Sequence, residues 1–148
     1  MWLATAKNGV IWVCGDEKLN NNIFANGRFA RDLVAITGFK TMGTTSKNAI
    51  YQFECAPLET VPPLYYPNAT DMKYSFNNTA LKRINWAENG KPVNCKDYTA
   101  FITTNIGLTE FPDILPKDNQ VTSVYNIMGS CATIRDYPDI MDFSNIRY

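Results

Sequence analysis

The chain has 148 residues, enough for one compact domain that buries roughly 68–70% of its unfolded surface. Fourteen basic and fourteen acidic side chains cancel at pH 7, which argues against nucleic acid as a partner held by general electrostatics. Because the chain has no histidine, Ser-His-Asp and Cys-His catalysis, histidine-ligated zinc and a histidine pH switch are excluded.

The first predicted element is a β-hairpin around Asn8-Gly9. Both turn residues tolerate the positive φ angles of a two-residue type I′ turn. Such a turn pairs Leu3 with Cys14 and Ala6 with Ile11. Apolar side chains occur on both faces of this hairpin, so we expect it to be buried or to lie at an interface.

A short helix is predicted between Asn26 and Gly38. Phe29, Leu33 and Ile36 fall at i, i+4 and i+7, which places them on one helical face. Asn26 is a suitable N-cap and Gly38 a suitable C-terminal stop. This is the one helix that we expect in the chain.

Most of the remaining chain is predicted to form β-strands. β-branched and aromatic residues alternate with others in several segments, and connections rich in Gly, Pro and Asn separate them. The predicted strands cover residues 49–55, 72–76, 97–104 and 121–128, with Gly129 interrupting before 130–134. A second hairpin is predicted at Asn89-Gly90, pairing 81–88 with 91–95, where Pro92 restricts the strand to a sheet edge.

A proline-rich stretch supplies the candidate binding residues. Half of the eight prolines lie between Pro57 and Pro67, which favours an extended, polyproline-like loop. Within it, Pro62-Pro63-Leu64-Tyr65 resembles the PPxY ligand of WW domains, but a surface loop whose tyrosines pack against its own domain is the favoured interpretation. Exposed tyrosines suit a contact surface because few rotors are frozen on binding. The candidate residues are Pro62, Pro63, Tyr65 and Tyr66.

The last residues, 136–148, form a possible docking arm. They combine apolar and polar groups without a clear period. Free termini usually fray, so a tail that keeps Phe143, Ile146 and Tyr148 indicates burial against a neighbour.

The four cysteines lie 41, 40 and 36 residues apart, and no two form a CxxC pair, so we expect no metal site. They are either free thiols buried as small apolar groups or two disulfides with three possible pairings. Cys55 alternates with Tyr51 and Phe53, which predicts that it lies in the core. The residues flanking the four cysteines differ, so we expect no repeat. The cysteines are Cys14, Cys55, Cys95 and Cys131.

Two possible N-glycosylation sites begin at Asn68 and Asn77. They matter only if the chain enters a secretory pathway. The start of the chain has no basic segment followed by an apolar run, so we expect either that it is not secreted or that a signal has been removed. No window approaches 18 consecutive apolar residues, so we expect no membrane span.

Together these features predict a mainly β protein: residues 1–148 as a single antiparallel sandwich or barrel with one short helix. No catalytic motif is present, so we expect neither an enzyme nor a cofactor. The leading hypothesis is a structural or surface component of a larger assembly, most plausibly a virus or phage particle, that contacts other protein subunits in a homo- or hetero-oligomer. The alternative is a secreted or cell-surface recognition module, lectin-like or receptor-binding, with two disulfides and N-glycans.

Overall fold

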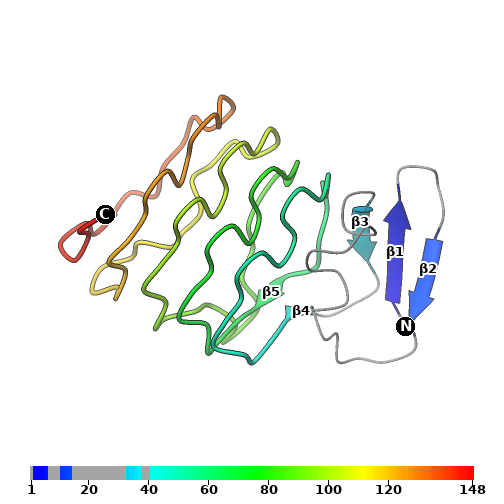
Figure 1. Cartoon of the computed structure of the whole chain (residues 1–148), viewed down its shortest axis with the longest axis horizontal. Coiled ribbons are helices and arrows are strands. Elements are labelled where there is room, and N and C mark those ends of the chain that lie inside the picture. Colours follow the sequence, from blue (N-terminus) through cyan, green and yellow to red (C-terminus); the bar gives the residue numbers. More distant parts are fainter. Residues whose placement is uncertain (1, 7–10, 15–32, 38–40) are drawn as a thin grey trace.

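The strands of the protein are short. The structure, a computed structural model, describes residues 2–6, 11–14, 33–37 and 41–148. Its strands are β1 (Trp2–Ala6), β2 (Ile11–Cys14), β3 (Leu33–Thr37), β4 (Met42–Gly43) and β5 (Leu64–Tyr65). β1 lies between β2 and β3 in an antiparallel sheet, and β4 pairs in parallel with β5 (Figure 1). Because these strands cover little of the chain, the sandwich or barrel stays a prediction.

The hairpin predicted near the start of the chain is present, with a register one residue away from the predicted one. Leu3 pairs with Val13, where the sequence analysis expects Cys14, and Thr5 pairs with Ile11. A two-residue turn fixes the predicted register, whereas the observed register requires a loop with an odd number of residues. Residues 7–10, which include the predicted turn, lie outside the described residues.

The predicted helix is wrong over residues 33–37, which form β3 antiparallel to β1. Apolar residues at i, i+4 and i+7 in a short window do not distinguish a helix from a strand paired at both edges. Val34, Ile36 and Thr37 are β-branched and favour the extended backbone, and β1 provides the edge with which they pair. The first part of the predicted helix, residues 26–32, lies outside the described residues.

From Asn48 onward the chain winds into coils that stack in parallel. Isolated bridges join Asn48 to Asp71, Asp71 to Asp97, and Asp97 to Ser123, at spacings of 23, 26 and 26 residues. Figure 1 shows successive turns of the chain side by side, from cyan to red. The expectation of no repeat is therefore wrong. Cys55, Cys95 and Cys131 occupy different places in three of these coils, so the cysteine spacing near 40 conceals the shorter period.

Each coil opens with a ribbon of consecutive turns. The four coils are coil 1 (48–70), coil 2 (71–96), coil 3 (97–122) and coil 4 (123–148). Two equivalent residues of every ribbon have positive φ angles: Tyr51, Tyr74, Ala100 and Asn126 at the first position, and Cys55, Asn78, Thr104 and Ser130 at the second. The strands predicted at 49–55, 72–76, 97–104 and 121–128 fall in these ribbons, where the backbone forms turns, so those strand predictions are wrong.

Burial along a ribbon does not follow the predicted alternation. In the ribbon of coil 1 the buried residues are Ala49, Gln52, Phe53 and Ala56, at i, i+3, i+4 and i+7. Coil 2 repeats this pattern at residues 72, 75, 76 and 79, and coil 3 at 98, 101, 102 and 105. The prediction that places Cys55 in the core is corrected accordingly: Cys55 is half-buried.

Hydrogen bonds between neighbouring ribbons hold the coils in register. Alternate N–H groups of one coil donate to carbonyl oxygens of the next. The amide of Tyr51 donates to Lys73 at 3.0 Å, that of Tyr74 to Thr99 at 3.1 Å, and that of Ala100 to Tyr125 at 2.9 Å. Within the ribbons these donors point toward the following coil, so the ribbons of the stack have a direction.

In coils 1 to 3, the first residue of the ribbon closes a small turn with its own side chain. Oxygens of Asn48, Asp71 and Asp97 accept the N–H two residues later at 3.0, 3.1 and 2.8 Å. Lys73 lies between two of these residues, 3.4 Å from Asp71 and 3.3 Å from Asp97. The charge of Asp71 is the main cause that raises the pKa of Lys73.

The interior of the stack is built largely from aromatic rings. The rings of Phe53 and Phe76 stack at 5.7 Å, and Phe101 meets Phe76 edge-on at 5.5 Å and Tyr98 at 5.0 Å. All four side chains are buried. Such pairs add about 0.5–1.5 kcal/mol each to the burial of their area.

The turn predicted at Asn89-Gly90 is present, but the predicted hairpin is not. Asn89 has a φ of 54°, and the amide of Gly90 donates to Ala87 at 2.8 Å. The segment pairs in parallel with β5, where Ala87 donates to Leu64 and Tyr66 donates to Gly90. The segment before the turn therefore pairs with β5 of the preceding coil and not with residues 91–95, as the predicted hairpin requires.

Candidate functional site

Coil 4 exposes side chains at positions that coil 3 buries. The bridge from Glu110 to Asp136 makes the residues that follow them equivalent. Phe111 and Ile114 of coil 3 are 4% and 2% exposed, whereas their counterparts Tyr137 and Ile140 are 53% and 70% exposed. Coil 4 lies at the outer edge of the described stack (Figure 1, orange to red). The difference in exposure follows from this position, because no described coil covers coil 4.

Large exposed apolar side chains gather on this coil. The described residues include nine of them, and six belong to coil 4. We call these six the end face: Tyr125, Met128, Tyr137, Ile140, Phe143 and Tyr148. Exposed apolar residues scattered singly are ordinary, whereas their concentration in the coil at one end of the stack favours a contact surface there.

Hydrogen bonds anchor the end of coil 4 to coil 3. The amide of Asp142 donates to Leu115 at 2.8 Å, and the side-chain amides of Asn119 and Asn145 donate to backbone carbonyls across the two coils at 2.8 Å. Hydrogen bonds from Ser144 hold the pKa of Asp142 below its usual value. The segment predicted as a docking arm, 136–148, is thus fixed on its own domain and presents its exposed side chains from there.

Only part of the predicted binding loop reaches the surface. Pro63 is exposed and Tyr65 is half-buried, and both line a depression of about 470 Å³ with Trp86. Pro62 and Tyr66 are buried, which agrees with a loop whose tyrosines pack against their own domain. The contact surface with an exposed Tyr66 is therefore wrong, and burial raises the pKa of the Tyr66 hydroxyl group. The reason is that this stretch contains β5, which pairs with β4 and leaves the loop no freedom to extend into solvent.

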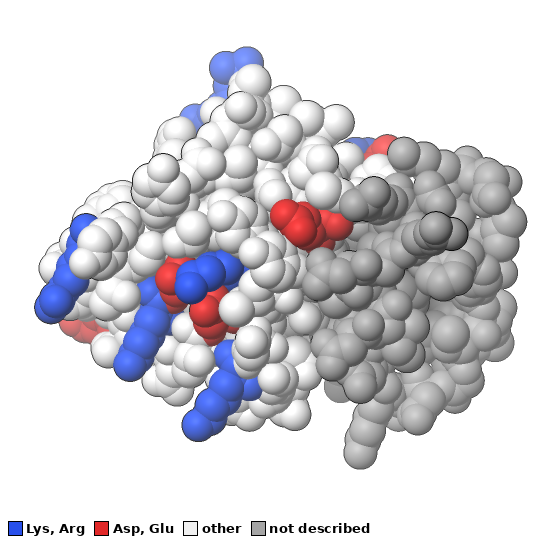
Figure 2. Space-filling model, in the orientation of Figure 1, with Lys and Arg blue, Asp and Glu red and all other residues white. Residues whose placement is uncertain are grey.

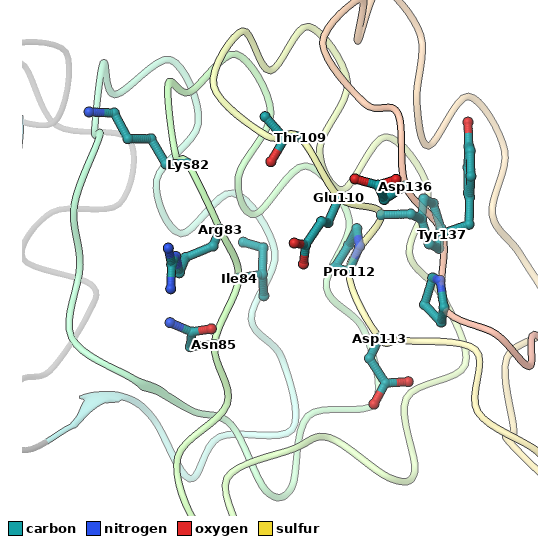
Figure 3. A pocket seen from close by; sticks show the side chains of 12 residues that line it. Lys82, Arg83, Ile84, Asn85, Thr109, Glu110, Pro112, Asp113, Asp136 and Tyr137 are labelled. Atoms are coloured by element: carbon teal, nitrogen blue, oxygen red, sulfur yellow. The ribbon is translucent and has the colours of Figure 1, made fainter.

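A second hollow crosses the side of coils 2 to 4. This lateral groove has a volume of about 350 Å³ and is lined by residues 82–85, 109–113 and 136–138. Figure 3 shows Lys82, Arg83 and Asn85 on one side of it and Glu110, Asp136 and Tyr137 on the other. The groove carries both signs of charge.

Two of its charged residues are already paired. Lys82 lies 3.7 Å from Glu59, and Asp113 lies 2.6 Å from Lys91. No group of three or more acidic or cysteine side chains in the described residues could hold a metal ion. The face drawn in Figure 2 likewise shows blue and red atoms scattered among white ones. The lateral groove is therefore suited to polar contact beside the end face.

Three of the four cysteines are described, and all three are free thiols. Cys95 is buried, and this burial raises the pKa of its thiol to about 12. Cys131 is half-buried, and desolvation raises its pKa as well. The side chain of Cys14 lies outside the described residues.

The two possible glycosylation sites differ in access. Asn68 is exposed, and its side-chain amide donates to Thr45 at 3.1 Å. Asn77 is half-buried and donates to Glu54 at 3.1 Å. The threonine of that second site, Thr79, is buried and bonded to both Phe76 and Asn105.

The predicted docking arm, 136–148, contains Tyr137, Ile140, Phe143 and Tyr148 of the end face but not Tyr125 or Met128. The reason for the exposure was not predicted, although the sequence contains a signal for it. Glu110-Phe111-Pro112-Asp113 and Asp136-Tyr137-Pro138-Asp139 repeat the order acid, aromatic, proline and aspartate 26 residues apart. Aligning these two segments reveals the coil period and makes Tyr137 the counterpart of a core residue. Exposure of the counterpart then follows from the open end of the stack.

Comparisons with known proteins find no matching family model, no similar curated protein and no similar solved structure. No helix long and apolar enough to cross a membrane occurs in the described part of the chain.

Proposed function

We propose that this protein is a structural or surface component of a larger assembly and acts through protein–protein contacts. The observation that carries the proposal is the contrast in exposure between Phe111 and Ile114 in coil 3 and Tyr137 and Ile140 in coil 4. Side chains of core type at the open end of a stack favour a partner that covers them.

The composition of the end face agrees with such a contact. Aromatic residues and methionine are enriched at protein interfaces, and the end face consists of three tyrosines, one phenylalanine, one methionine and one isoleucine. Fully burying an apolar side chain of this size stabilises a complex by about 1.5–3 kcal/mol. The lateral groove, which shares Tyr137 with the end face, adds polar and charged groups beside it. Such groups contribute to the choice of partner.

The assembly we propose is a virus or phage particle, with other protein subunits as partners. The test is to isolate the protein from its natural source and to measure the size and membership of the complex that carries it. The proposal predicts a stoichiometric place in a particle. Recovery of the chain as a monomer, at native concentration and with the end face still exposed, would contradict it.

The second candidate function is a secreted or cell-surface recognition module, lectin-like or receptor-binding. The exposed position of Asn68 favours it, because a glycan there meets no buried surface. The three free thiols argue against the two disulfides that this function predicts. Intact mass of native material, with and without reductant, separates the candidates: four free thiols and no glycan leave only the assembly component.

A further inference from the structure

The edge of coil 4 carries backbone donors that have no acceptor within the described part of the chain. In coils 1 and 2, all three donors at the equivalent positions bind carbonyls of the following coil, and in coil 3 Ala100 and Thr104 do so. The three donors of coil 2 are Tyr74, Phe76 and Asn78, at 3.1, 3.0 and 2.8 Å. The corresponding amides of coil 4, those of Asn126, Met128 and Ser130, have no acceptor among the described residues, and all three residues are exposed. The edge is therefore a continuation of the interface that joins the coils.

Apolar side chains accompany these donors. Val124 and Ile127 lie three residues apart and occupy the positions that Tyr98 and Phe101 occupy in coil 3. One amide of this edge already has an acceptor, because Val124 donates to the carbonyl of Tyr148 at 2.7 Å. A segment that continues along the edge from this bond would cover both apolar residues and accept all three remaining hydrogen bonds.

We infer that the partner adds a coil to this edge, through a segment of another protein whose carbonyl oxygens at every second residue accept from Asn126, Met128 and Ser130. The inference rests on the proposed function and names the form of its contact. The segment places apolar side chains three residues apart over Val124 and Ile127, as the inner coils do. Main-chain bonds then supply affinity and these side chains supply specificity.

A second copy of this chain fits the edge less well. Two copies that meet through their coil 4 edges place donors against donors, which leaves buried N–H groups without acceptors and destabilises the contact. At the other end of the stack, the inward side chains Ala49 and Phe53 of coil 1 are already fully buried. A different polypeptide with a row of free carbonyls avoids both difficulties.

Hydrogen exchange tests this inference on the assembly isolated from the natural source, with the purified chain as reference. We expect the amides of Asn126, Met128 and Ser130 to exchange at least about tenfold more slowly in the assembly. The amides of Tyr74 and Asn78, already bonded to coil 3, serve as internal controls and should not change.

The outcomes separate the inference from the proposed function. An assembly in which these three amides exchange as fast as in the free chain overturns the added coil and leaves the contact role intact. Equal protection in a concentrated solution of the purified chain alone overturns the choice of partner in favour of a second copy. A chain found without partners in its natural source overturns both.

Discussion

The rings of Phe111 and Tyr137 stack with their centroids 6.0 Å apart and their planes 25° apart, yet one residue is buried and the other exposed. The two residues hold equivalent positions in adjacent coils, so they differ mainly in what lies on their outer side. This relationship separates residues that stabilise the fold from residues that are available to a partner.

Alanine at these two positions should affect stability very differently. Phe111→Ala removes a buried ring and leaves a cavity, so we expect a loss of about 3–5 kcal/mol in the free energy of unfolding. Tyr137→Ala removes a half-exposed ring, so we expect a loss below about 1 kcal/mol. Urea denaturation of both variants measures the difference. Equal losses would mean that coil 4 is covered in the isolated chain.

Asn105 should be the most important polar side chain of coil 3. It is fully buried, its side-chain nitrogen donates to Thr79 at 2.9 Å, and its oxygen accepts the amides of Gly107 and Leu108 at 2.8 and 2.7 Å. Asn105→Ala leaves these buried groups without partners, so we expect a loss of about 2–4 kcal/mol. Asn94→Ala, at an exposed position, is the matched control and should change stability by less than about 0.5 kcal/mol.

Two glycines of the coils, Gly107 and Gly129, should differ in their tolerance of alanine. A Cβ atom on Gly107 would lie 2.6 Å from the carbonyl oxygen of Leu81 and would also overlap the backbone of Ala80, which cannot move independently. On Gly129 it would meet only the side chain of Asn126. We expect Gly107→Ala to lower the free energy of unfolding by about 1–3 kcal/mol, and Gly129→Ala to lower it less. The melting temperatures of the two variants measure this difference. The reverse order would contradict the coil packing.

Stability should fall at alkaline pH. Burial raises the pKa of Cys95 from 9.0 to about 12 and raises the pKa values of Tyr66 and Tyr98 above their usual 10.0. Between the unfolded and folded pKa values the unfolded chain binds fewer protons than the folded chain, so the free energy of unfolding decreases as pH rises. The contribution is fully present below pH 9. Urea midpoints between pH 7 and pH 11 measure the decline.

Cys95→Ala provides the control for this pH effect. It removes one of the three buried acidic groups. The free energy of unfolding should therefore decrease less steeply between pH 9 and pH 12, because one fewer group releases its proton on unfolding. An unchanged decline would show that Cys95 is accessible to solvent in the folded chain. Stability that increases above pH 9 would contradict the burial of all three groups.

The sequence predicts the hairpin near the start of the chain better than it predicts the coils. Asn8-Gly9 is a local signal, and the pairing of β1 with β2 depends on few residues beyond it. In the ribbons, aromatic and β-branched residues such as Tyr51 and Phe53 indicate strands by their type. The buried positions nevertheless follow i, i+3, i+4 and i+7, because the backbone turns at residues with positive φ angles that no glycine marks.

The candidate site depends on relationships that a single pass along the sequence does not contain. Tyr66 looks like Tyr65 in the proline-rich loop, yet pairing with the segment around Gly90 buries it. Ile140 and Ile114 are the same residue type in similar surroundings, and only the position of coil 4 in the stack exposes Ile140. Long-range stacking decides both cases, so residue type alone does not predict them.

The most direct test of the end face compares two isoleucines with the same exposure. Ile140 on the end face and Ile106 on coil 3 are both 70% exposed, so Ile140→Asp and Ile106→Asp should leave the isolated chain equally folded. Each variant is produced beside the unmodified chain in the natural source, and the ratio in the assembly is measured by mass spectrometry. We expect Ile140→Asp to be depleted at least about tenfold, because the contact would bury its carboxylate, and Ile106→Asp to be incorporated normally. Equal incorporation of the two folded variants would contradict the account.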